Sequence, residues 1–259
     1  MILYSNGCSF TWGGSLFKFE RDMPTKEYPM PGLKTNTDID RIRLETVYPY
    51  HLGKLLNINK VINDSVQAGS NARIVRKTLK YFHNLLLNNK DISDHLVTIQ
   101  WTDLSRTEHF HQGGAWFQFS PNTAMAEDPN RIEFDAGPWK DMYYSSFDSD
   151  ERQIEMFIQQ VYTLGYFLES HKIPYVFFTH ARNIASLYTN TRSTQLIKEK
   201  DLIKLLNRFV WYNNDCDHAN MHESGIDTCN NAHPNKNGHK HWAERLYNFI
   251  NEKRLINGS

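Results

Sequence analysis

The most reactive side chains near the start of the chain directly follow an apolar segment. The apolar opening breaks at Gly7, Cys8 and Ser9 follow, and apolar residues resume at Phe10. This pattern is typical of a buried strand that ends in a tight turn carrying a nucleophile. A serine hydroxyl is a weak nucleophile at neutral pH, and it needs an imidazole within hydrogen-bond reach to take its proton. Ser9 is therefore predicted to attack an acyl carbon with the help of a histidine.

Two short blocks at opposite ends of the chain resemble the SGNH (GDSL-like) hydrolases. The segment Gly7-Cys-Ser-Phe-Thr11 is similar to that family's first block, Gly-Asp-Ser, with Cys8 in place of the aspartate. The segment His233-Pro-Asn235 resembles the last block, in which the histidine before the proline is the catalytic base. The resemblance spans nearly the whole chain. It implies that His233 takes the proton of Ser9, and that Cys8 points away from substrate as a buried packing residue.

The third member of the catalytic set is open. The resemblance implies an aspartate three residues before the histidine, and Asn230 stands at that position. An amide can orient an imidazole through its carbonyl oxygen, but it cannot stabilise imidazolium by charge. Asp227 lies three residues further back, within reach of His233 if the loop folds over. A triad with Asn230, a triad with Asp227 and a Ser–His dyad are the three alternatives.

The oxyanion hole departs from the family pattern. The resemblance implies that the backbone N–H groups of Ser9 and Gly69 bind the oxyanion, because Gly69 lies where the second block falls. The third block, Gly-x-Asn-Asp, is replaced by Trp101-Thr-Asp-Leu104, so its oxyanion asparagine is missing. The expected substitutes are the hydroxyl of Thr102 and the amide of Asn71, since both carry a donor.

Two further residues border the predicted site. Trp101 ends a predicted buried strand, and the carboxyl end of a strand in a parallel sheet faces the site. Arg106 follows shortly after, and either meets a polar or anionic substrate or pairs with Glu108. Trp101 and Arg106 are therefore candidate substrate contacts.

No metal or other cofactor is predicted. One polar segment groups acidic and imidazole side chains with a single i,i+4 histidine pair: Asp215, Asp217, His218 and His222. Such a pair suits a metal on a helix, but no third ligand has a fixed spacing. The expectation is a solvent-facing cluster.

The elements that must position these groups alternate regularly. Apolar strands are expected at the opening and at 60–63, 95–101 and 174–179, and amphipathic helices at 45–56, from about 71 to 88, from Ser149 to near His171, and after Asn235. This alternation predicts an α/β fold with one doubly wound (flavodoxin-like), mainly parallel sheet and helices on both faces.

A long stretch rich in aromatics interrupts the alternation at about 104–148. We interpret it as a loop or hairpin insertion on the catalytic face of a single domain covering residues 1–259. Its aromatic residues are expected to pack a small core of their own, with stacking on a sugar as the alternative: Trp116, Phe117, Trp139, Tyr143 and Tyr144.

Composition narrows the function classes. Among 259 residues, the 29 Lys and Arg balance the 29 Asp and Glu, so no global field favours nucleic acid or an anionic membrane. No apolar run spans a membrane and no signal peptide is recognisable, so the expected location is the cytoplasm. Three cysteines without framework spacing argue against disulfides and structural zinc.

The predicted function is that of a serine esterase that removes an O-acyl group, such as acetyl, from a small-molecule or carbohydrate ester. An O-acyltransferase and a catalytically lapsed glycan-binding protein on the same scaffold are the alternatives. The altered positions Cys8, Asp103 and Asn230 favour the lapsed form. The sequence specifies neither the substrate nor the oligomeric state.

Overall fold

The computed structural model of the chain describes residues 1–14, 16, 43–112, 114–126, 136–179, 208–212 and 233–256. Every structural statement below refers to these residues. Within them, no helix is long and apolar enough to cross a membrane.

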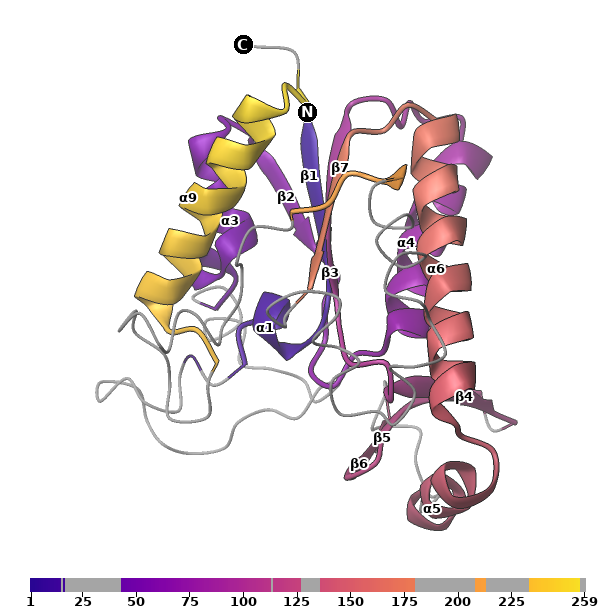
Figure 1. The fold of residues 1–259 in the computed structure, drawn as a ribbon. Helices are drawn as coiled ribbons and strands as arrows, with labels where there is room; N and C mark the ends of the chain where they lie inside the picture. The colour runs from indigo at the N-terminus through magenta and orange to yellow at the C-terminus, as the bar shows by residue number, and fades with distance from the viewer. Residues whose placement is uncertain are drawn as a thin grey trace.

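A four-stranded parallel sheet with the order β2-β1-β3-β7 forms the centre of the molecule. Its strands are β1 (Ile2–Asn6), β2 (Lys60–Asn63), β3 (His95–Trp101) and β7 (Tyr175–Thr179). All four run the same way, so their carboxyl ends meet at one edge, the lower edge in Figure 1. The predicted parallel α/β class is confirmed.

Helices cover both faces of this sheet (Figure 1). The helices α3 (Tyr48–Leu55) and α9 (Lys236–Glu252) lie on one face, and α4 (Asn71–Leu87) and α6 (Asp150–Ser170) lie on the other. Side chains alternate across a strand, so Leu3 enters the core beneath α3 and α9 while Tyr4 enters the core beneath α4 and α6. The doubly wound arrangement predicted from the alternation is thereby confirmed.

Polar side chains fix where three of the helices begin. Ser70 accepts a hydrogen bond from the N–H of Arg73 at the start of α4, and Ser149 accepts one from the N–H of Arg152 at the start of α6. Asn235 does the same for the Gly238 N–H, so α9 begins at Lys236. Each cap satisfies an N–H that has no acceptor inside the helix.

A second, antiparallel sheet lies at the carboxyl-end edge of the first (Figure 1). It consists of β4 (Thr107–His111), β5 (Ala115–Ser120) and β6 (Thr123–Ala126), and the helix α5 (Gly137–Ser146) follows it. These elements lie inside the range 104–148. The name insertion is used below for residues 104–148.

A short extended segment continues the main sheet beyond β7. The N–H of Phe177 donates to the carbonyl of Val210 over 2.9 Å, and the N–H of Tyr212 donates to the carbonyl of Phe177 over 2.8 Å. This segment therefore completes the backbone hydrogen bonding at the free edge of β7.

Candidate active site

The turn after β1 is held by buried polar contacts. The N–H of Gly7 donates to Asn6 Oδ1 over 2.8 Å, and Asn6 Nδ2 donates to Thr78 Oγ1 of α4 over 3.1 Å. A Cβ at Gly7 would lie 2.9 Å from Cβ of Gln100, closer than real Cβ atoms approach one another. Glycine is therefore required where the chain turns into the short helix α1 (Ser9–Trp12).

The neighbouring residues Cys8 and Ser9 differ in how deeply their side chains are buried. Cys8 is fully buried, and its Sγ lies 3.6 Å from Gln100 Oε1, which also accepts a hydrogen bond from Thr11 Oγ1 over 2.8 Å. The expectation that Cys8 packs in the interior is confirmed. Ser9 is half-buried at the first position of α1.

The structure brings Ser9 and His233 together across 224 positions of sequence. Ser9 Oγ and His233 Nε2 lie 2.9 Å apart, within hydrogen-bond distance. The Phe10 ring stacks on the His233 ring, with centroids 4.4 Å apart and planes 15° apart. On another side, a Cβ at Gly14 would lie 2.9 Å from His233 Cδ2. Phe10 and Gly14 thus fix the ring that faces Ser9, a role that their positions in the sequence did not reveal.

A second histidine of the same block is structural. His239 is fully buried in α9, and its Nδ1 accepts a hydrogen bond from the N–H of Tyr48 over 3.2 Å. Burial lowers the pKa of His239 to about 3, and the positive charges of His51 and His233 act in the same direction. A neutral His239 therefore joins α9 to the start of α3.

Gly69 lies directly against the nucleophile turn. The N–H of Val66 donates to the Gly7 carbonyl over 3.4 Å, and a Cβ at Gly69 would lie 3.1 Å from that carbonyl oxygen. The N–H of Gly69 donates to the Val66 carbonyl over 3.3 Å, so an oxyanion would have to compete with this long hydrogen bond. The N–H of Ser9 begins a helix, where the first N–H groups have no acceptor within the helix.

Asn71 and Thr102, the two expected substitutes for the oxyanion asparagine, contact each other. The Thr102 N–H donates to Asn71 Oδ1 over 2.8 Å, and Asn71 Nδ2 donates to the Thr102 carbonyl over 3.0 Å. The amide has two N–H groups, so one remains after this contact. Thr102 Oγ1 is buried without a hydrogen-bond partner in the described part of the chain. Both donors therefore have spare capacity.

The structure corrects the prediction that Trp101 contacts the substrate. The Trp101 side chain is fully buried and lies edge-on to Phe157 and Phe177, with centroids 5.5 and 5.4 Å away. Trp101 is a core residue because its side chain points to the face that α6 covers. Its prediction as a substrate contact is wrong.

Of the two alternatives for Arg106, the pairing with Glu108 is not formed. Arg106 lies 3.2 Å from the carboxylate of Asp103 at the end of β3, and remains a candidate for a polar substrate. Glu108 instead receives two hydrogen bonds from Arg76 of α4, over 2.8 and 2.7 Å.

Asn230 and Asp227, the two candidates for the triad acid, lie outside the described residues, and so does the segment with Asp215, Asp217, His218 and His222. In the remainder, no three His, Cys, Asp or Glu side chains are grouped so that they could hold a metal ion.

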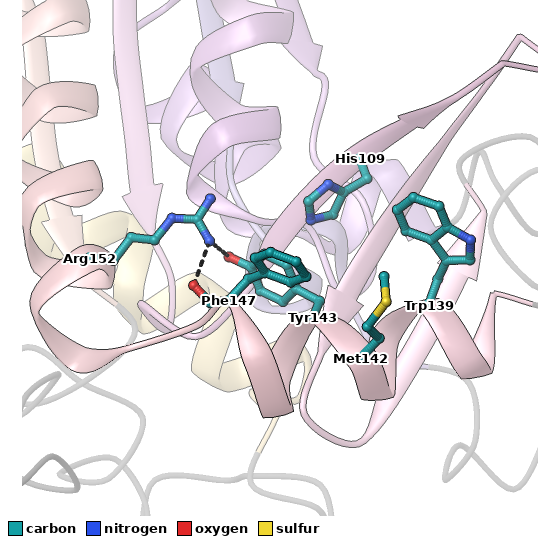
Figure 2. Close-up of a pocket in the computed structure, with 6 residues that line it drawn as sticks. All are labelled: His109, Trp139, Met142, Tyr143, Phe147 and Arg152. Atoms are coloured by element: carbon teal, nitrogen blue, oxygen red, sulfur yellow. Dashed lines mark hydrogen bonds between the residues drawn. The ribbon is translucent and has the colours of Figure 1, made fainter.

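A hollow of about 350 Å³ lies between the insertion and the start of α6 (Figure 2). Neither Ser9 nor His233 is among the residues that line it. Six side chains line it: His109, Trp139, Met142, Tyr143, Phe147 and Arg152. Burial lowers the pKa of His109, and the charge of Arg152 adds to this effect, so the ring is neutral near pH 7. Arg152 Nη1 donates to the Tyr143 hydroxyl and to the Phe147 carbonyl, each over 3.0 Å.

The insertion's aromatic residues divide between packing and exposure. Phe117 and Tyr143 are buried, as the packing expectation requires, and the Trp116 ring is covered by the Arg76 guanidinium at 3.9 Å from its centroid. Trp139 is 51% exposed and Phe147 is 59% exposed, both at the hollow. At this hollow, these two rings are the aromatic faces open to a ligand.

The chain matches one family model. A family model described as a family of unknown function (DUF6071) matches residues 30–259. A search of curated proteins finds no match to the chain.

Three of the solved structures that the chain matches are the following. The psychrotrophic esterase EstA from Pseudoalteromonas sp. is 8% identical with a TM-score of 0.49, and 98% of this chain and 99% of that one are covered. TesA is 9% identical with a TM-score of 0.47, covering 99% and 100%. A member of the lipolytic protein G-D-S-L family from Veillonella parvula is 10% identical with a TM-score of 0.45, covering 97% of each chain.

Proposed function

The chain belongs to a family of unknown function, DUF6071, and we propose that it is a serine esterase that removes an O-acyl group through an acyl-enzyme on Ser9. The observation that carries this proposal is the 2.9 Å contact between Ser9 Oγ and His233 Nε2 at the carboxyl edge of a parallel sheet. That edge is where open α/β sheets bind their ligands. A nucleophile and a base within hydrogen-bond distance are the minimum that acyl transfer requires.

The reaction proceeds in two halves. His233 Nε2 takes the hydroxyl proton as Ser9 Oγ attacks the acyl carbon, and the carbonyl electron pair moves onto oxygen. Collapse of this tetrahedral intermediate breaks the ester bond, and the alcohol leaves with the proton held by His233. Water then attacks the acyl-enzyme, gives a proton to His233, and releases the carboxylic acid and free Ser9.

Four groups of the chain carry a donor for the proposed oxyanion. We assign the N–H groups of Ser9 and Gly69 to it, together with the remaining N–H of Asn71 or the hydroxyl of Thr102. The contact between Asn71 and Thr102 supports this assignment, because it fixes the Asn71 amide against the Thr102 backbone, just after β3 ends. Asn230, Asp227 or neither completes the site by orienting His233.

The substrate class is proposed from the insertion. Exposed aromatic rings beside polar side chains suit a sugar ring, whose apolar face stacks while its hydroxyl groups bond. Trp139 and Phe147 offer such rings at the hollow, with His109 and Arg152 beside them. We therefore favour a carbohydrate carrying an acyl group such as acetyl, on a single domain of residues 1–259 with 104–148 as the insertion.

The lapsed glycan-binding protein is the second candidate, because the hollow is separate from the Ser9–His233 pair and can bind a glycan without catalysis. Turnover separates the two. We expect the protein to hydrolyse p-nitrophenyl acetate, with kcat/KM reduced at least about 10³-fold in both Ser9→Ala and His233→Ala. Equal rates in the wild type and in both folded variants would refute the esterase.

A further inference from the structure

Three consecutive residues, the two that precede α4 and the first residue of α4, are each fixed by a different part of the molecule. Gly69 lies against the carbonyl of the nucleophile turn, where a Cβ would come within 3.1 Å of Gly7 O. Asn71 bonds to the backbone at the end of β3 over 2.8 and 3.0 Å. Ser70, between them, is held by Gln118 of the insertion.

Gln118 makes two hydrogen bonds to Ser70. Its Oε1 accepts from the Ser70 N–H over 3.0 Å and from the Ser70 hydroxyl over 2.9 Å. The Ser70 oxygen in turn accepts from the N–H of Arg73 and so begins α4. Ser70 is fully buried and Gln118 is 2% exposed, so water does not replace these contacts.

A charged pair fixes which way the Gln118 amide points. Gln118 Nε2 donates to Glu108 Oε2 over 3.1 Å, and the Glu108 carboxylate also receives Arg76 Nε and Nη2. A carboxylate only accepts, so it requires the NH₂ end of the amide, while the two donors of Ser70 require the oxygen end. The reversed amide would leave buried groups without partners, and this chemistry holds Oε1 on Ser70.

We infer that Gln118 is a positioning residue for the reaction: by holding Ser70, it fixes the preceding Gly69 against the Gly7 carbonyl of the nucleophile turn, and so fixes the N–H group that the proposed function assigns to the oxyanion. The inference rests on the proposed function. Removing an oxyanion donor altogether typically costs about 10²–10³ in kcat. Releasing Ser70 displaces the donor without removing it, so the expected loss is smaller and falls on the chemical step rather than on substrate binding.

The test is Gln118→Met, which keeps the length of the side chain and removes both polar ends. We expect kcat for p-nitrophenyl acetate, per site that reacts with a fluorophosphonate, to fall at least about tenfold with KM nearly unchanged. Gln112→Met is the matched control, because Gln112 is an exposed residue of the same insertion. It is expected to keep the wild-type kcat.

A second test exchanges the side chains of positions 108 and 118, and it applies if Gln118→Met does not fold. Gln118→Glu places two carboxylates side by side and is expected to lower kcat. Adding Glu108→Gln restores an acceptor facing Ser70 and a donor between positions 108 and 118, so kcat should recover.

The outcomes separate the two proposals. Wild-type kcat in folded Gln118→Met, or no recovery in the double variant, overturns the positioning role while the esterase stands. Absence of turnover in the wild type overturns the esterase itself, and the positioning role with it.

Discussion

His233, the proposed base, is held by contacts that the spacing of residues in the sequence does not predict. The motifs predicted that Ser9 and His233 meet, since both belong to blocks of recognisable pattern. Phe10 and Gly14 touch the His233 ring from positions about 220 residues away, and neither residue type indicates such a contact by itself. Trp101 failed as a prediction for a related reason, because the end of a strand alone does not reveal which face its last side chain joins.

Gly14→Ala tests the placement of the His233 ring. The added methyl group would lie 2.9 Å from Cδ2 and 3.1 Å from Nε2, so the ring must move away from Ser9. We expect kcat/KM for an ester to fall about tenfold or more, since small misplacements of a base are costly. Circular dichroism should show a melting temperature close to that of the wild type. Full activity in this variant would mean that His233 has room to adjust.

At the scale of elements, the strands and helices of the main sheet follow from periodicity, while the docking of the insertion does not. The predicted strands at 60–63 and 95–101 coincide with β2 and β3. On α4, Arg76 pairs with Glu108 and covers Trp116, and both of these residues belong to the insertion. The hydrophobic pattern of a helix does not predict contacts with side chains of a hairpin that lies later in the sequence.

Arg76→Met tests this docking. The change leaves the Glu108 carboxylate, 5% exposed, without its cationic partner, so we expect the free energy of unfolding to fall by about 1–3 kcal/mol. Urea denaturation measures the loss. Lys80→Met on the same helix is the control and should change stability by less than about 0.5 kcal/mol, because Lys80 is exposed. Equal effects would show that Arg76 contributes no more than a solvated side chain.

At the scale of the whole molecule, composition and alternation predicted the fold class, but not how the sheet ends. The segment Val210–Tyr212 pairs with β7 through two hydrogen bonds, too short a contact for any alternation pattern to signal. Several histidines of the fold have lowered pKa values. Burial lowers the pKa of His51, His95 and His241 as well as that of His239.

His239→Asn tests the resulting acid sensitivity. Wild-type His239 stays neutral in the folded protein down to a pKa of about 3, whereas the unfolded chain takes up a proton near pH 6.5. Stability is therefore full above pH 6.5 and falls as the pH drops below it, by up to about 1.4 kcal/mol per pH unit for this group.

Asparagine keeps an acceptor for the Tyr48 N–H but removes the imidazole that takes up a proton. The variant should lose less stability than the wild type between pH 6.5 and 4.5, as thermal melts across that range will report. Parallel curves for the two proteins would contradict the assignment to His239.

The most direct test of the central claim is the site of covalent labelling by a fluorophosphonate. We expect intact-mass analysis to show one adduct, fragment spectra to place it on Ser9, and Ser9→Ala to abolish it while Cys8→Ala retains it. An adduct on another residue, or a folded wild-type protein that does not react, would contradict the account.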